Sequence, residues 1–376
     1  MLGWRRPVQS HSRIRARDSG PASPEQGGRA VRVLLQEGRS MLSRDPPLPA
    51  RLMAPWLDDN AKFQQELSQR QLNLQAVAEL RDRIRNQIRM AEKAEPCLLA
   101  AVDAASMSVP FGDQVSVLIQ TVRIDDDGTP TLSAPERVTG ILGHEMRLVE
   151  SPMRFAAECR ELAKSTTPTI ADGSYWSFLM DVNQAIVRDE SIAQSSLKAA
   201  VKCLIDDGAF LAMVQNVNVI AMTKTSESDT LVKGISDRHI LGQVLQPGEY
   251  LAPRLLSEGT GGIFGIERRR FKQTERELLQ DHFKRVLGVV FYKPHPWSRA
   301  YRIEGHIKQF ENLNWLLPLL AAISAHTETS RRIIEPFPQF MADYTAKRLV
   351  AVGKLYGERN WHRNPEANYL YARTGR

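Results

Sequence analysis

Six apolar residues in succession, Cys97 to Val102, lead directly into Asp103, and small residues follow it. A run of this length, opened by Pro96, predicts a short strand that is buried on both faces of a sheet. A carboxylate at the end of a buried strand is costly unless a cation compensates it. Asp103 is therefore either a metal ligand or the cap of the next turn, and for this stretch alone the turn cap is the simpler interpretation.

A second segment of the chain follows the same pattern. Pro168 opens a short β-prone run that ends in Asp172, and Gly173 comes next. A plain Asp-Gly turn would explain this segment by itself. Two such strand ends in one domain favour a shared acidic site, because neighbouring carboxylates repel each other unless a cation lies between them. Asp181, which follows another apolar run, is a rival for the second position.

Three further polar residues could join these aspartates. Glu158 lies on a predicted helix four residues after Arg154, with which it could instead form an ordinary surface ion pair. Lys224 follows a predicted strand among hydroxyl side chains, where it could hold a phosphate or remain a solvated loop lysine. Asp343 lies in the first turn of a predicted late helix. Carboxylates without a partnering His or Cys favour a hard divalent cation, magnesium or manganese, held by oxygen ligands.

Composition and cysteine usage bound the class of protein. The chain has 376 residues, of which 42% are hydrophobic and 25% charged, so it can bury a sizeable core. No apolar stretch is long enough to span a bilayer, and no membrane association is expected. The three cysteines lie far apart without a CxxC motif, which argues against a zinc site or a disulfide framework and favours a cytoplasmic location.

Domain boundaries follow from charge and periodicity. Residues 1–55 are expected to form a disordered basic tail, since residues 1–52 hold ten Arg and four acidic residues; a targeting peptide or a start at Met53 would also explain them. Residues 56–95 carry apolar residues at steps of three and four and predict a long amphipathic helix. Residues 96–357 form the expected α/β domain, and residues 358–376 a polar C-terminal tail.

The order of the motifs resembles that of the NurA nucleases, which act in DNA end resection with a HerA-type hexameric ATPase. The matching stretches are Val102–Ser106, Arg154–Glu158, Asp172–Ser174, Met222–Ser226, Tyr292, Arg302–Glu304 and Pro338–Asp343. Two positions depart from the family pattern. Ala104 stands where the family usually has Gly, and Asp343 stands where some members have His.

The resemblance implies an RNase H-like mixed β-sheet core flanked by helices, in a ring-shaped homodimer that threads DNA. It implies a manganese-dependent enzyme, with magnesium as a substitute, that has 5′–3′ exonuclease and single-strand endonuclease activity, uses a two-metal mechanism and acts in double-strand-break end resection. By position, Asp103, Glu158, Asp172 and Asp343 would bind the metal, Lys224 would contact the scissile phosphate or the ligands, and Tyr292 would lie beside the active site. The alternative is a non-catalytic DNA-clamp or adaptor subunit of a HerA-like translocase.

Overall fold

The computed structural model describes residues 74–362, apart from short gaps at 112–113, 143–144, 192–194, 224–229, 233–234, 260–265, 267–270 and 330–334. The predicted basic tail, the first part of the predicted N-terminal helix and Lys224 therefore lie outside the described residues. Within the described part of the chain, no helix combines the length and the apolar character that a bilayer crossing needs.

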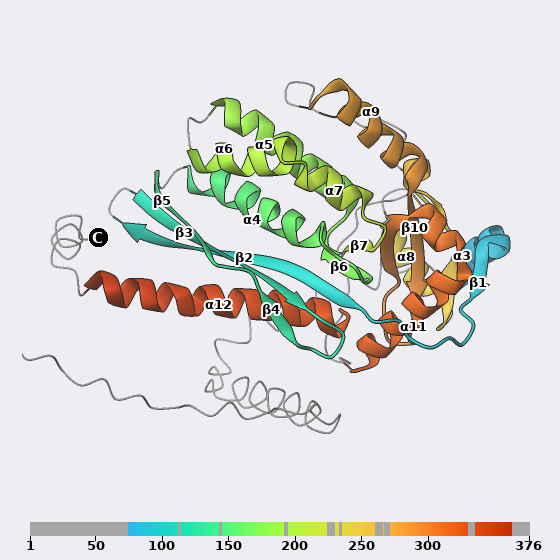
Figure 1. The fold of residues 1–376 in the computed structure, drawn as a ribbon. Coiled ribbons are helices and arrows are strands. Elements are labelled where there is room, and N and C mark those ends of the chain that lie inside the picture. Colours follow the sequence, from blue (N-terminus) through green and yellow to red (C-terminus); the bar gives the residue numbers. More distant parts are fainter. Residues whose placement is uncertain are drawn as a thin grey trace, which may run out of the picture. The chain divides into compact units, whose positions relative to one another are not determined.

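The described strands form one mixed sheet with the order β1-β8-β10-β11-β7-β6-β2-β3-β4, while β5 pairs with β3 and β9 with β10 (Figure 1). The strands are β1 (Ile88–Met90), β2 (Ala100–Phe111), β3 (Gln114–Ile124), β4 (Pro130–Leu132), β5 (Glu136–Leu142), β6 (Thr169–Asp172), β7 (Val219–Thr223), β8 (Glu249–Leu251), β9 (Arg254–Leu255), β10 (Leu287–Lys293) and β11 (Tyr301–His306).

The centre of the sheet combines an antiparallel hairpin with two parallel strands. β2 and β3 form the hairpin, β6 pairs with β2 in parallel, and β7 pairs with β6 in parallel. Parallel neighbours need crossover connections, and helices supply them here. α4 (Met146–Leu162) precedes β6, while α5 (Tyr175–Ser191), α6 (Ser195–Val201) and α7 (Ala209–Gln215) connect β6 to β7. The predicted mixed sheet flanked by helices is confirmed.

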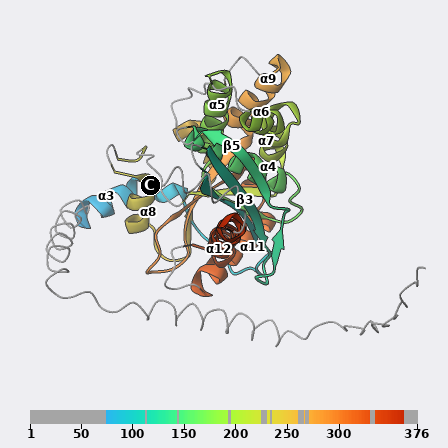
Figure 2. The same ribbon diagram turned by 90° about the vertical axis from the view of Figure 1, so that its left-hand side faces the viewer.

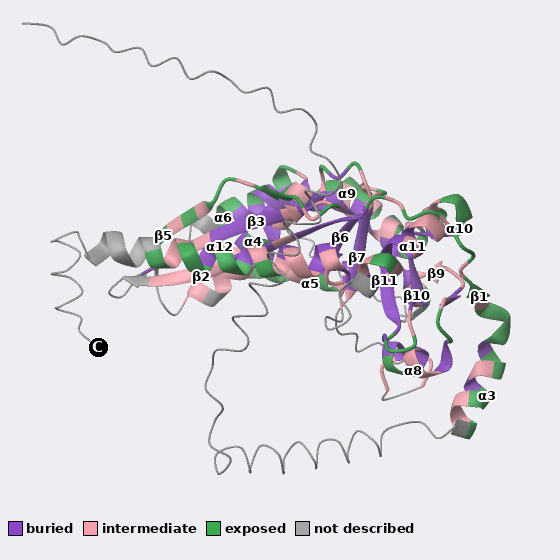
Figure 3. Cartoon of the chain, turned by 90° about the horizontal axis from the view of Figure 1, so that it is seen from below, coloured by how far each residue is buried: buried purple, intermediate pink, exposed green. Residues whose placement is uncertain are grey.

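Helices cover both faces of this central region. α4 to α7 lie on one face, and α11 (Leu313–Thr329) and α12 (Phe337–His362) lie on the other (Figure 1 and Figure 2). The strands between them are buried, as β6 and β7 show (Figure 3). The remaining helices are α3 (Leu74–Ile84), α8 (Asp237–Val244), α9 (Gln273–Asp281) and α10 (Ile307–Glu311). α12 continues five residues past residue 357, the predicted boundary of the polar tail.

The predicted helix over residues 56–95 is wrong at its C-terminal end. α3 ends at Ile84, and after a 3-10 turn the chain forms β1, which runs antiparallel to β8. Arg81 also makes two hydrogen bonds of 2.7 Å to the carboxylate of Glu249, at the start of β8. The backbone pairing with β8 and this ion pair outweigh the helical periodicity that would place Ile84 and Ile88 on one face.

The strand that carries Asp103 differs from its prediction. It begins at Ala100 instead of Cys97, and it continues past Asp103 because β3 remains paired with it as far as Phe111. β6 pairs only with the first three residues of β2, ending at Val102. Asp103 therefore lies within a strand, at the point where β2 and β6 separate.

Candidate active site

Asp103 and Asp172 occupy equivalent positions on neighbouring parallel strands. The last residues paired between β2 and β6 are Val102 and Ala171, and an aspartate follows each of them. Residues in register on adjacent strands project to the same face, and the strands lie about 5 Å apart. Ala101 and Ile170, which precede the aspartates by two residues, both pack in the core beside α11 and α12. The two carboxylates therefore face α12 side by side.

Glu158 reaches the same place from α4, on the opposite face of the sheet. Its Oε1 atom accepts a hydrogen bond of 3.2 Å from the backbone N–H of Ala104, directly after Asp103. The side chain is only 14% exposed. Burial raises the pKa of Glu158 to about 7, against the opposing effect of Arg154, whose Nε atom lies 3.8 Å from Oε1. Glu158 is thus a buried acid at the point where β2 and β6 separate.

α12 contributes a fourth carboxylate and an amide. Gln339 donates a hydrogen bond of 3.2 Å from Nε2 to Oδ1 of Asp172. One turn later, Asp343 shares a hydrogen bond with the carboxyl group of Asp103. Asp343 also pairs with Lys347, whose Nζ atom lies 2.6 Å from Oδ1. The sequence analysis identified Asp343 and missed Gln339, although the spacing of four residues between them was a signal that both lie on one helix face.

The carboxylates influence one another's ionisation. Burial raises the pKa of Asp103 well above its ordinary value, and the charges of Glu158, Asp172 and Asp343 raise it further. A divalent cation favours the ionised forms of such a cluster and removes their mutual repulsion. Carboxylate oxygens are also the donors that Mg²⁺ and Mn²⁺ prefer. The residues present therefore fit a hard divalent cation in their chemistry.

The carboxylates of the candidate site do not form a coordination sphere for a cation in this structure. Among the residues that the structure describes, no three His, Cys, Asp or Glu side chains converge as a metal-binding group. Asp103 instead accepts a hydrogen bond of 2.9 Å from the Ala104 N–H and contacts Asp343, which in turn contacts Lys347. Binding of a cation would exchange these contacts for contacts to the metal.

Asp181, the rival of Asp172, lies in α5 and not at the end of a strand. Its charge reaches Glu158 and helps to raise the pKa of that residue. Burial raises the pKa of Asp181 as well, while Arg154 and Arg188 lower it. The structure thus places Asp172 beside Asp103 in the strand register, and Asp181 on the helix behind Glu158.

The structure does not bring Tyr292 to the carboxylates. It is the penultimate residue of β10, three strands from β6 in the sheet order. Its ring is buried with Tyr250 and Tyr301 in the core beside α11, and its hydroxyl group hydrogen-bonds with Ser324. Tyr292 thus lies in this core, apart from the carboxylates, and its predicted place beside the active site stays a prediction.

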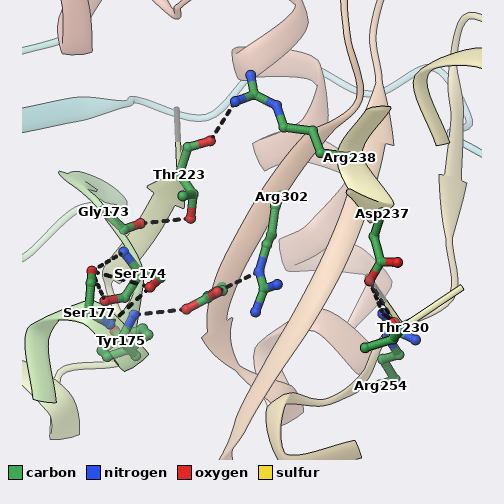
Figure 4. Close-up of polar contacts among 11 residues, drawn as sticks. Gly173, Ser174, Tyr175, Ser177, Thr223, Thr230, Asp237, Arg238, Arg254 and Arg302 are labelled. Carbon is green, nitrogen blue, oxygen red and sulfur yellow. Dashed lines mark hydrogen bonds and ion pairs between the residues drawn. The ribbon is translucent and has the colours of Figure 1, made fainter. Parts of the chain in front are cut away.

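A buried carboxylate that the sequence analysis did not assign supports the segment between β6 and α5. Glu304 on β11 is fully buried. Its Oε2 atom accepts a hydrogen bond of 2.8 Å from the N–H of Tyr175, and Oε1 accepts one of 2.7 Å from Nε of Arg302 (Figure 4). Thr223 donates a hydrogen bond of 3.1 Å to the carbonyl of Gly173. These contacts fix the backbone immediately after Asp172.

Replacing Glu304 by Ala is expected to destabilise the fold by about 3–5 kcal/mol, because it removes the carboxylate that compensates the buried Arg302. Urea unfolding followed by circular dichroism measures this change. Glu311→Ala, at an exposed position on α10, is the control and should stay within about 0.5 kcal/mol of wild type. Equal unfolding midpoints for Glu304→Ala and wild type would show that the buried pair contributes nothing to stability.

Comparison with known proteins identifies a similar fold. No protein-family model matches the chain, and no curated protein matches its sequence. The crystal structure of the NurA nuclease from Sulfolobus solfataricus is 13% identical, with a TM-score of 0.54 over 83% of this chain and 98% of that chain. Another NurA structure is 11% identical, with a TM-score of 0.48 over 82% of this chain and 99% of that chain. A NurA structure with manganese is 11% identical, with a TM-score of 0.42 over 79% and 94%.

The similarity to the S. solfataricus structure extends over nearly the whole of that protein. The chain therefore has the NurA-like, RNase H-like fold that its motifs predicted.

Proposed function

We propose that the chain is a divalent-metal-dependent deoxyribonuclease that hydrolyses phosphodiester bonds at the site of Asp103 and Asp172. The observation that carries this proposal is the pair of aspartates in register on adjacent parallel strands, with Glu158 and Asp343 added from the two faces of the sheet. The fold shared with a NurA nuclease supports DNA as the substrate. The fold alone would not establish an activity, so the proposal depends on the carboxylates.

The side chains of the site would have distinct tasks. The four carboxylates would hold the cation, which when bound neutralises charge on the phosphate and lowers the pKa of the attacking water. Gln339 orients Asp172, and the Ala104 N–H orients Glu158. Arg154 and Lys347 each form an ion pair with a carboxylate one helical turn away and would supply positive charge near the site, one from each face of the sheet. Lys224, which directly follows β7, is proposed as a further phosphate contact.

The proposal extends to the activities and partners that the motif resemblance implies. We propose manganese as the working ion, with magnesium as a substitute, and both 5′–3′ exonuclease and single-strand endonuclease activity by a two-metal mechanism. We further propose a homodimer that acts with a HerA-like hexameric ATPase in double-strand-break end resection. A carboxylate at position 343 is an oxygen ligand where some NurA proteins have a nitrogen ligand, so the preference between Mn²⁺ and Mg²⁺ is the property most open to change.

The direct test is cleavage of labelled single-stranded and double-stranded DNA by the purified full-length protein. We expect cleavage with Mn²⁺ that stops when the metal is chelated, with or without a HerA-type ATPase. Intact DNA under all of these conditions would contradict the nuclease proposal.

A non-catalytic DNA clamp or adaptor is the second candidate, and one observation favours it: no three described side chains converge as a metal-binding group. An adaptor would bind DNA in a salt-sensitive manner without a need for metal. Its affinity would be the same for wild type and for Asp103→Ala, with and without Mn²⁺. Binding measured across a salt series therefore separates the two candidates.

A further inference from the structure

α12 carries two parallel rows of side chains beside the candidate site. The first row consists of Gln339, Asp343 and Lys347. Gln339 contacts Asp172, Asp343 contacts Asp103, and Lys347 contacts Asp343. The second row consists of Phe340, Tyr344 and Arg348, each one residue further along the helix. Residues four apart are neighbours on a helix surface, so each row is continuous.

The second row forms a stack that faces outward. The rings of Phe340 and Tyr344 are stacked, with centroids 5.9 Å apart and planes 17° apart. The guanidinium carbon of Arg348 lies 6.0 Å from the centroid of Tyr344, and Nη1 donates a hydrogen bond of 3.3 Å to the tyrosine hydroxyl. Tyr344 is nevertheless 40% exposed, and Arg348 is exposed as well. An ordered aromatic side chain is thus held at the surface by its neighbours in the row.

Single-stranded nucleic acid is the ligand that this combination fits. Its bases stack on exposed aromatic rings irrespective of sequence, and its phosphates are attracted by nearby cations. Lys347 and Arg348, next to the exposed ring, supply two such cations. A base stacked on Tyr344 would lie beside Asp343, the preceding residue of the helix, and would bring its own phosphates to the carboxylates. The exposed lysine disfavours a protein partner, since lysine is depleted in protein interfaces.

We propose that Phe340, Tyr344 and Arg348 form a nucleobase-stacking row that holds a single DNA strand with its phosphates directed to the site of Asp103 and Asp172. This inference rests on the proposed nuclease function and adds to it a binding surface for the substrate strand. Recognition through stacking requires unpaired bases, so the row selects single-stranded or locally unpaired DNA.

The experiment measures binding without cleavage. Fluorescence anisotropy of a short labelled oligothymidine, in buffer with EDTA, gives Kd for the full-length protein and its variants. Tyr344→Ala is expected to weaken binding about 5- to 100-fold, and Tyr344→Phe, which keeps the ring, to remain within about threefold of wild type. Leu355→Ala removes an exposed apolar side chain further along the same helix and is the matched control. An abasic oligonucleotide of equal length should bind wild type and Tyr344→Ala equally.

Other results would contradict either the stacking row or the nuclease function. Equal affinity of wild type and Tyr344→Ala for the intact strand, or no binding by wild type, would overturn the stacking row. A change from dimer to monomer in Tyr344→Ala, with unchanged DNA affinity, would make the row an interface between copies of the chain and overturn the proposal. Binding that depends on Tyr344 in a protein that cleaves no DNA with Mn²⁺ would support the row and contradict the nuclease function.

Discussion

Asp103→Asn is expected to lower the rate of Mn²⁺-supported DNA cleavage about 1,000-fold, equivalent to about 4 kcal/mol of transition-state stabilisation. Asparagine keeps the size of the side chain but removes the charge that would hold the cation between β2 and β6. Asp172→Asn should have an equally large effect, because it occupies the matching position in the strand register. Single-turnover rates with saturating enzyme measure the loss without interference from weaker DNA binding.

Asp181→Asn provides the matched control for these variants. It removes the same charge from α5, at a position whose charge also reaches Glu158. We expect it to lower the rate about 10- to 100-fold, the range typical of changes to residues that support metal ligands. A larger loss in Asp181→Asn than in Asp172→Asn would show that the second ligand is the helical aspartate. Asp103→Asn should unfold at no lower temperature than wild type, since it relieves repulsion among buried carboxylates.

The metal-free protein is expected to lose stability as the pH rises from 5 to 8. Burial raises the pKa of Glu158 from 4.5 to about 7, so the native state keeps a proton that the unfolded chain releases. The stabilisation from this proton is complete below about pH 4.5 and is lost as the pH passes 7. A difference of this size corresponds to about 3 kcal/mol. The raised pKa of Asp103 acts in the same direction.

Mn²⁺ should reverse this loss, because on the proposed function it would bind the ionised carboxylates of the native state. Urea unfolding at pH 5 and pH 8, with EDTA or with millimolar Mn²⁺, gives the four free energies that are needed. Glu158→Gln should flatten the pH dependence in EDTA, whereas Glu161→Gln, on the same helix but bound to Lys164, should leave it unchanged. A wild-type protein that becomes more stable between pH 5 and pH 8 in EDTA would contradict the buried acidic cluster.

The central pair of aspartates could be predicted because its signal is local. Apolar runs before Asp103 and Asp172 mark buried strands, and a charged residue after such a run has few structural explanations. That the two positions match in register could not be predicted, because register depends on strand pairing between distant segments. The sequence also placed Asp103 at the end of a strand. Asp103 instead lies within β2, directly after Val102, where the pairing of β2 with β6 ends.

The residues that support Asp103 and Asp172 could not be predicted from the sequence. Glu304 contacts a helix start 129 residues earlier in the chain, and Gln339 contacts an aspartate 167 residues earlier. No local pattern encodes such contacts. The segment after Ile84 shows the opposite error, since pairing with β8 overrules its helical periodicity. Local patterns thus predicted the acidic residues of the candidate site, and tertiary structure determines what holds them in place.

The most direct test of the acidic site is calorimetric titration of Mn²⁺ into wild type, Asp103→Asn, Asp172→Asn and Asp181→Asn at pH 8. The account predicts at least one saturable Mn²⁺ site in wild type, its loss in Asp103→Asn and in Asp172→Asn, and its retention in Asp181→Asn. Absence of Mn²⁺ binding in wild type, or undiminished binding in Asp103→Asn, would contradict the claim that these carboxylates form a metal site.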